Sequence, residues 1–265
     1  MQLHVNHTTQ YTYDQPVDYA LQKVRLRPLS SPLQNVITWE TVVDGGKIEA
    51  SYRDHYGNHV DLVSIARGAR QLDIIATGTV VTSDAAGILG HVYGCAPLWH
   101  FAQATPLTTA EDRIKSLATQ LRASANKLQG LHALSAAILQ ATPYLLGKTG
   151  INTTAEEALA IGHGVCQDHA HIFVAAARAA GIPARYVSGY LMINDQIEQD
   201  ASHAWAEAYL DDLGWVGFDV SNGVAPDEKY VRIAIGRDAS DAAPVSGMRL
   251  GTSEEAMIVS LQVQQ

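Results

Sequence analysis

The sequence reads Gly162-His163-Gly164-Val165-Cys166-Gln167-Asp168-His169-Ala170-His171, and the run that follows, 172–180, consists almost entirely of apolar or small residues. This pattern predicts a buried helix that begins near Cys166 and ends at Gly181, with Pro183 beyond it as a second helix breaker. A thiol in the first turn of such a helix lies near unpaired backbone N–H groups and the positive end of the helix dipole, which favour the reactive thiolate. Cys166 is therefore a candidate nucleophile, although a single cysteine in apolar surroundings is more often a small core residue.

Two further stretches, 200–209 and 214–223, each predict a short strand. In the first, large side chains alternate with alanines, so that His203, Trp205 and Glu207 face one side of the strand. The residues between the strands, 210–214, are typical of a turn. The two strands are therefore expected to form an antiparallel hairpin.

The register of this hairpin decides whether His203 and Asp219 meet. If Tyr209 pairs with Trp215, His203 lies diagonally across from Asp219 on the same face, at roughly 7–8 Å between backbones. A shift of one residue would separate them. We expect the first register because it alone lets the carboxylate hold the imidazole, although taken singly the two residues also fit a core histidine and a turn cap.

A cysteine nucleophile, a histidine base and a carboxylate that orients the histidine form a triad that occurs on unrelated folds. In order and spacing, the segments around Cys166, His203 and Asp219 resemble the transglutaminase-like superfamily, specifically its bacterial transglutaminase-like proteins and cysteine proteases. The segments that carry the resemblance are 164–168, 180–191, 202–205 and 215–219. The resemblance implies that Cys166 is the nucleophile, His203 the general base and Asp219 the orienting acid.

The resemblance extends to the start of the chain, where 11–17 and 25–28 are similar to the N-terminal region that accompanies bacterial transglutaminase-like cores. Two departures stand out: His169 lies where family members often carry an aromatic residue, and Val220-Ser221 where Pro-Thr is common. Neither position supplies a triad atom, so the departures concern substrate fit rather than chemistry. The segment 236–241 also matches the family, without a physical account of its role.

Composition limits the classes of function. The chain has 265 residues, 47% of them hydrophobic and 17% charged, which is enough to bury a large core. A net charge of −9 argues against a nucleic-acid partner, and no stretch approaches the roughly 20 apolar residues of a membrane span. With two cysteines, Cys95 and Cys166, and no leader-like N-terminus, the expected location is the cytoplasm, where a thiol stays reduced.

The first part of the chain, 1–105, is expected to be an all-β domain. Runs rich in Val, Ile, Thr and Tyr alternate with turn signals and predict strands at 4–13, 24–27, 36–43, 48–52, 60–65 and 72–81. Arg25 and Arg27 are expected on a solvated edge-strand face.

The second part, 106–265, is expected to be the catalytic domain. Helices are predicted after a capping-box pattern at Thr108–Glu111, at 131–140, from Thr153 or Thr154 to Ile161, and at 166–180. Strands are predicted at 185–192, 203–210, 215–219, 230–235 and 257–263. Helices that precede an antiparallel sheet indicate an α+β fold, and the resemblance implies a transglutaminase/papain-like core with the nucleophile at a helix N-terminus.

These observations predict acyl transfer on an amide or peptide bond through a thioester on Cys166. Hydrolysis by a cysteine protease or amidase is favoured by family analogy, and a protein-glutamine transglutaminase that uses an amine acceptor is the alternative. A metal site at His163, Cys166 and His169 and a binding module without catalysis stay open as other classes. The expected partner is a peptide or protein amide, with no nucleic acid, membrane or cofactor, and no basis for calcium.

Overall fold

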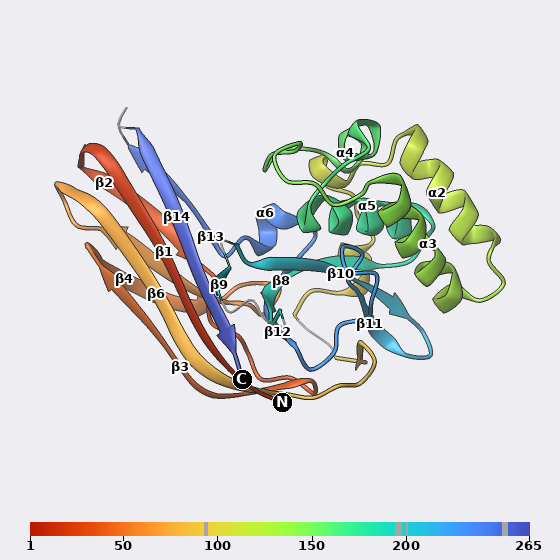
Figure 1. The fold of residues 1–265 in the computed structure, drawn as a ribbon, viewed down its shortest axis with the longest axis horizontal. Coiled ribbons are helices and arrows are strands. Elements are labelled where there is room, and N and C mark those ends of the chain that lie inside the picture. The colour runs from red at the N-terminus through yellow and green to blue at the C-terminus, as the bar shows by residue number, and fades with distance from the viewer. Residues whose placement is uncertain (93–94, 194–197, 200, 251–253) are drawn as a thin grey trace.

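The computed structural model of the protein describes residues 1–92, 95–193, 198–199, 201–250 and 254–265. Three sheets and a layer of helices make up this part of the chain (Figure 1). Two sheets of long strands pack together at one end of the molecule, and the third carries the helices at the other end. The predicted α+β class is confirmed.

The N-terminal β unit contains most of the strands expected before residue 105. They are β1 (Gln2–Val17), β2 (Tyr19–Val24), β3 (Gln34–Asp44), β4 (Gly46–Arg53), β5 (His59–Ile65) and β6 (Ala69–Thr82). Alternating burial along β1 and β6 follows the period of two, and side chains such as Tyr11 and Leu72 form a core between the two sheets. The strand predicted at 24–27 was wrong, because β2 ends at Val24.

Arg25, the residue that follows β2, has a different environment from the one expected. Arg25 is buried rather than solvated, with its guanidinium 3.4 Å from a carboxylate oxygen of Asp54 and a hydrogen bond to the carbonyl of Ala243. The expectation of a solvated edge was therefore wrong for Arg25. A segment more than two hundred residues away in the sequence satisfies this arginine, and no local pattern indicates it.

Strand pairing crosses residue 105 in both directions. The sheets run β3-β6-β1-β14-β9 and β13-β2-β5-β4, so that the late strands β9 (Glu198–Gln199), β13 (Val245–Leu250) and β14 (Glu255–Gln264) join the N-terminal unit. In return, β7 (Ile88–Gly90) pairs with the third sheet, which carries His203 and is called the catalytic sheet below. The expected division at residue 105 separates the sequence motifs, but the sheets are shared across it.

The catalytic sheet has the order β12-β8-β10-β11-β7. Its main strands are β8 (Ala184–Leu191), β10 (His203–Leu210), β11 (Gly214–Phe218) and β12 (Tyr230–Gly236). The hairpin of β10 and β11 pairs Tyr209 with Trp215, which is the expected register. Gly214 closes its turn with a φ of 75°, a conformation that favours glycine, and a Cβ there would lie 2.2 Å from the backbone of Gly90.

Helices cover one face of this sheet (Figure 1). They are α2 (Asp112–Ala123), α3 (Lys127–Ala141), α4 (Ala155–Ile161), α5 (Cys166–Ala179) and α6 (Ala239–Ala242). The short α1 (Leu98–Phe101) packs on the other face, where Phe101 contacts Trp215. The central helix α5 packs on the alanine face of β10, where Ala204, Ala206 and Ala208 share a core with Phe173. It ends at Gly181 (φ 86°), and Ile182 N–H donates to the Ala177 carbonyl, as in a Schellman motif. No helix among the described residues is both long and apolar enough to cross a membrane.

Two helix starts were predicted from capping patterns, with different outcomes. At α4, Thr154 accepts from Glu157 N–H and the Glu157 side chain accepts from Thr154 N–H, as expected. The helix start predicted at Thr108 was wrong, because Thr108 ends a short 3₁₀ turn, Pro106–Thr108, and α2 begins at Asp112. The Thr108 hydroxyl instead accepts from Thr105 N–H and from Arg178.

The segment 236–241 joins the two ends of the molecule. The Arg237 carbonyl accepts from Arg178 of α5, and the Asp241 carboxylate accepts from the Tyr56 hydroxyl of the N-terminal unit. Asp238 caps α6 by accepting from Ser240 N–H at 2.9 Å. This segment therefore clamps the end of the catalytic helix to the β unit, which gives it a structural role.

Candidate active site

Cys166, His203 and Asp219 come together at one end of the catalytic sheet. Cys166 is the half-buried first residue of α5, His203 is the first residue of β10, and Asp219 directly follows β11. His203 Nε2 lies 2.6 Å from Asp219 Oδ2, and the Cys166 side chain is close enough to raise the pKa of the same ring. Because Asp219 occupies Nε2, the other ring nitrogen, Nδ1, is left for Cys166. The three residues predicted from the sequence form one continuous chain.

Asp219 is fully buried, and its carboxylate accepts from two residues besides His203. The Asn222 side-chain amide and the Tyr230 hydroxyl each donate to Oδ2 at 2.7 Å. Asn222 N–H also lies 3.3 Å from Oδ1, which makes the turn after β11 a cradle for the carboxylate. Neither residue was predicted from the sequence. Asn222 has a weak local signal, as a turn residue three positions after Asp219, whereas Tyr230 arrives on β12 without one.

The pKa values of His203 and Asp219 are shifted in opposite directions. Burial alone lowers the pKa of His203, but the hydrogen bonds and negative charges of Asp219 and Cys166 outweigh it and raise the pKa from 6.5 to about 10. Burial raises the pKa of Asp219, but the hydrogen bond and charge of His203, with help from Asn222 and Tyr230, lower it below its ordinary value. The geometry therefore favours a protonated His203 imidazolium beside an ionised Asp219 carboxylate.

Asp168 braces the start of the catalytic helix. Its buried carboxylate accepts from Val165 N–H at 2.8 Å and from the Thr149 hydroxyl at 2.6 Å through Oδ2. Gly164 is required here because a Cβ would lie 2.8 Å from Asp168 Cβ. Asp168 thus holds the residue before Cys166 against the first turn of α5.

The two departures from the family pattern contact each other. His169 Nδ1 lies 2.8 Å from the Ser221 hydroxyl, and His169 Nε2 lies 2.6 Å from the Thr142 carbonyl, to which it donates. Burial lowers the pKa of His169, which keeps the ring neutral and lets Nδ1 accept from Ser221. The pair links the first turn of α5 to the turn after Asp219, so the two substitutions form a single structural unit.

The alternative metal site does not form. Among residues whose placement the structure describes, no group of three or more His, Cys, Asp and Glu side chains is arranged to hold a metal ion. His169 turns inward and engages both of its ring nitrogens, which separates it from Cys166 as a ligand.

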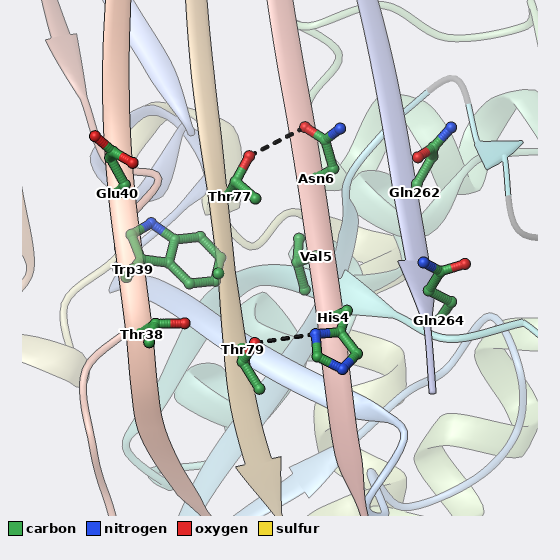
Figure 2. A pocket seen from close by; sticks show the side chains of 11 residues that line it. His4, Val5, Asn6, Thr38, Trp39, Glu40, Thr77, Thr79, Gln262 and Gln264 are labelled. Carbon is green, nitrogen blue, oxygen red and sulfur yellow. Dashed lines mark hydrogen bonds between the residues drawn. The ribbon is translucent and has the colours of Figure 1, made fainter.

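A groove lies on the outer face of the β3-β6-β1-β14 sheet, away from these residues (Figure 2). This groove of about 460 Å³ is lined by polar side chains, and hydrogen bonds join Thr77 to Asn6 and Thr79 to His4 across neighbouring strands. No cysteine lines it. The groove is therefore separate from the chemistry at Cys166.

Comparisons with known proteins agree with this site. Residues 115–220, which contain all three site residues, match the transglutaminase-like superfamily, and residues 3–81 match the bacterial transglutaminase-like N-terminal region. An uncharacterized protein of Mycobacterium leprae is 26% identical over 98% of both chains. A protein-glutamine gamma-glutamyltransferase of Pseudomonas aeruginosa is 34% identical over 97 residues, which are 32% of this chain and 14% of that protein.

Among solved structures, a candidate cysteine protease from Cytophaga hutchinsonii aligns with a TM-score of 0.78 and 26% identity. The alignment covers 100% of this chain and 91% of the other. The likeness therefore includes the N-terminal β unit as well as the catalytic core.

Proposed function

This chain carries a transglutaminase-like core together with a bacterial transglutaminase-like N-terminal region, and from that premise we propose that it transfers acyl groups from an amide or peptide bond through a thioester on Cys166. The observation that supports the proposal most directly is the environment of His203. One side of its ring is held by Asp219 and the other contacts the Cys166 side chain. This is the division of labour between nucleophile, base and orienting acid.

In the first step, Cys166 Sγ attacks the carbonyl carbon of the amide. Backbone N–H groups in the first turn of α5 have no partner within the helix, so they are the natural donors to the oxyanion. The C–N bond then breaks, and His203 gives its proton to the departing amine. The acyl group is left on Cys166 as a thioester, and Asp219 keeps the imidazole in position.

In the second step, an acceptor attacks the thioester. His203 takes a proton from the acceptor, the C–S bond breaks, and the thiolate is restored. Water as acceptor yields a carboxylic acid, and a primary amine yields a new amide. We favour water because the structural relative that aligns over the whole chain is a candidate cysteine protease, whereas the gamma-glutamyltransferase matches over a third of it.

The proposal also covers the setting of the reaction. The substrate is a peptide or protein amide, and no cofactor is needed because every proton and electron pair in both steps is supplied by the three side chains and the acceptor. A cytoplasmic location, in which Cys166 stays reduced, is proposed with it.

The test offers the purified protein a glutamine-containing peptide in water, with and without a fluorescent primary amine. Intact-mass spectrometry of the protein follows the thioester, and analysis of the peptide separates cleavage, deamidation and amine incorporation. We expect a Cys166-linked acyl adduct and hydrolysed product. Amine incorporation in excess of hydrolysis would favour the transglutaminase alternative, and the absence of an adduct and of any product would contradict acyl transfer.

A further inference from the structure

Large apolar side chains lie exposed beside the nucleophile. Most come from the segment between α3 and α4, residues 142–154, and one ends α4. We call this group, whose members are all exposed, the apolar rim: Tyr144, Leu145, Leu146, Ile151 and Ile161. Leu146 is 72% exposed and Ile151 is 79% exposed, so neither side chain is needed to fill the core. A concentration of exposed apolar surface is typical of an interaction site.

The segment that carries the rim is fastened to the catalytic helix on both sides of Cys166. Tyr144 bridges Gly164, whose carbonyl accepts from Leu145 N–H at 2.9 Å. Beyond the nucleophile, the Gln167 side chain donates to the Ile151 carbonyl at 3.3 Å. These bonds use backbone and polar atoms, so the apolar side chains are left facing solvent at a fixed distance from the thiol.

A third tether strengthens this arrangement. The Thr149 hydroxyl donates to the Asp168 carboxylate at 2.6 Å, and the same carboxylate holds Val165 N–H at the helix start. The segment therefore has the same anchor as the nucleophile. A substrate group that contacts the rim is positioned relative to Cys166 without a loop movement.

A hollow of about 710 Å³ lies at the rim, and its lining combines the apolar side chains of Ile151, Ala160 and Ile161 with the polar ones of Asn152, Thr153 and Glu157. The apolar part of this lining suits a hydrocarbon side chain. The occupant we infer is therefore part of the acyl-transfer substrate itself.

We propose that the apolar rim binds a side chain next to the scissile amide, and that the protein selects peptides with a bulky apolar residue at that place. This inference rests on the proposed function, since it requires the substrate carbonyl to lie at Cys166. A substrate that partly buries a leucine side chain against such a surface should have a kcat/KM about tenfold higher than one with asparagine, its polar isostere.

The test uses two peptidyl chloromethyl ketones that differ only in one residue next to the reactive group, leucine or asparagine. The Cys166 sulfur displaces chloride and forms a thioether, so the second-order rate reports binding at the site even where turnover is slow. Iodoacetamide measures the reactivity of the thiol without a peptide. Leu146→Asn replaces an isobutyl group by an amide of the same number of heavy atoms, and Ile151→Thr replaces an ethyl group by a hydroxyl. Leu250→Asn, at a 64% exposed position on β13, is the matched control.

The leucine reagent is expected to react about tenfold faster than the asparagine reagent with the unmodified protein. Leu146→Asn and Ile151→Thr should bring this ratio toward one and leave the iodoacetamide rate unchanged, whereas Leu250→Asn should change neither. A ratio near one in the unmodified protein, or a ratio that both rim variants leave intact, would overturn the inference while acyl transfer still stands. A Cys166 that iodoacetamide fails to modify would overturn the proposed function and this inference together.

Discussion

Strand β8 of the catalytic sheet and strand β4 of the N-terminal β unit are both antiparallel to their neighbours and both eight residues long, yet they are buried very differently. All eight residues of β8 are buried, whereas seven of the eight residues of β4 are exposed. The catalytic sheet is covered by α5 on one face and by aromatic residues such as Trp205 and Trp215 on the other. Strand β4 is held by its neighbour β5 and keeps its side chains in solvent.

The difference shows how the site is positioned. His203 and Asp219 lie at the ends of strands that packing holds from both sides, so a small displacement of either would open gaps in a close-packed core. In the N-terminal unit, backbone pairing fixes the strands and leaves many side chains free to vary. The effects of substitutions in the two regions should therefore differ in kind as well as in size.

The largest effect is expected from Cys166→Ala. Removal of the nucleophile should abolish acyl transfer, and because the thiol is only half-buried the unfolding temperature should change little. Cys95→Ala, at an exposed cysteine, is the control and should keep full activity. Activity that survives in Cys166→Ala, or that is lost in Cys95→Ala, would show that Cys166 is not the nucleophile.

Asp219→Asn should lower turnover next most, by up to about four orders of magnitude, because the imidazole loses the partner that fixes its tautomer and orientation. Labelling of Cys166 by iodoacetamide should persist in part, since the thiol itself is intact. Tyr230→Phe removes one hydrogen bond to the same carboxylate and serves as the graded control, with a smaller loss. An Asp219→Asn protein with unchanged turnover would contradict the orienting role.

Phe173→Ala tests burial directly. Phe173 is fully buried and its ring stacks on Phe218 at 4.8 Å between centroids, so the substitution should lower the free energy of unfolding by about 3–5 kcal/mol. Val42→Thr, at an exposed position on β3, should change it by less than about 0.5 kcal/mol. Urea unfolding of both variants measures the contrast, and equal losses would show that the two regions do not differ as described.

The smallest effect concerns pH. The pKa of His203 rises from 6.5 in the unfolded chain to about 10 in the folded one, so its protonated form stabilises the fold. This contribution is complete below pH 6.5 and is lost as the pH rises toward 10. The difference in unfolding free energy between the unmodified protein and His203→Gln should shrink over this range, and a difference that grows with pH would refute the imidazolium.

That Cys166, His203 and Asp219 lie together could be predicted because the signals for it are local. Cys166 precedes an apolar helix, and the alternation along β10 together with the turn before Gly214 sets the register that brings His203 to Asp219. The supporting residue Tyr230 could not be found this way, because it reaches Asp219 only through the pairing of β12 with β8. Strand order within a sheet depends on contacts between distant segments, and periodicity along the chain does not encode it.

The same limit explains why the pairing partners of the late strands could not be predicted. Met257 to Val263 shows strand character, but its partner is β1 at the other end of the sequence rather than a neighbour in the catalytic sheet. Arg25 was expected in solvent for the same reason, since the Ala243 carbonyl that accepts from it is remote in the chain. The departures at His169 and Ser221 were read separately from the sequence, and only the structure shows that they are hydrogen-bonded to each other.

The pairing of β1 with β14 has a consequence for synthesis in the cell. His4 pairs with Gln264, so the ribosome makes the catalytic core between the two partner strands. At roughly 5–20 residues per second, β1 waits more than about ten seconds for β14, with one hydrogen-bonding edge uncovered. A second chain that has already completed β14 can supply that strand. Exchange of β14 between two such chains is thus the characteristic misassembly that this topology invites.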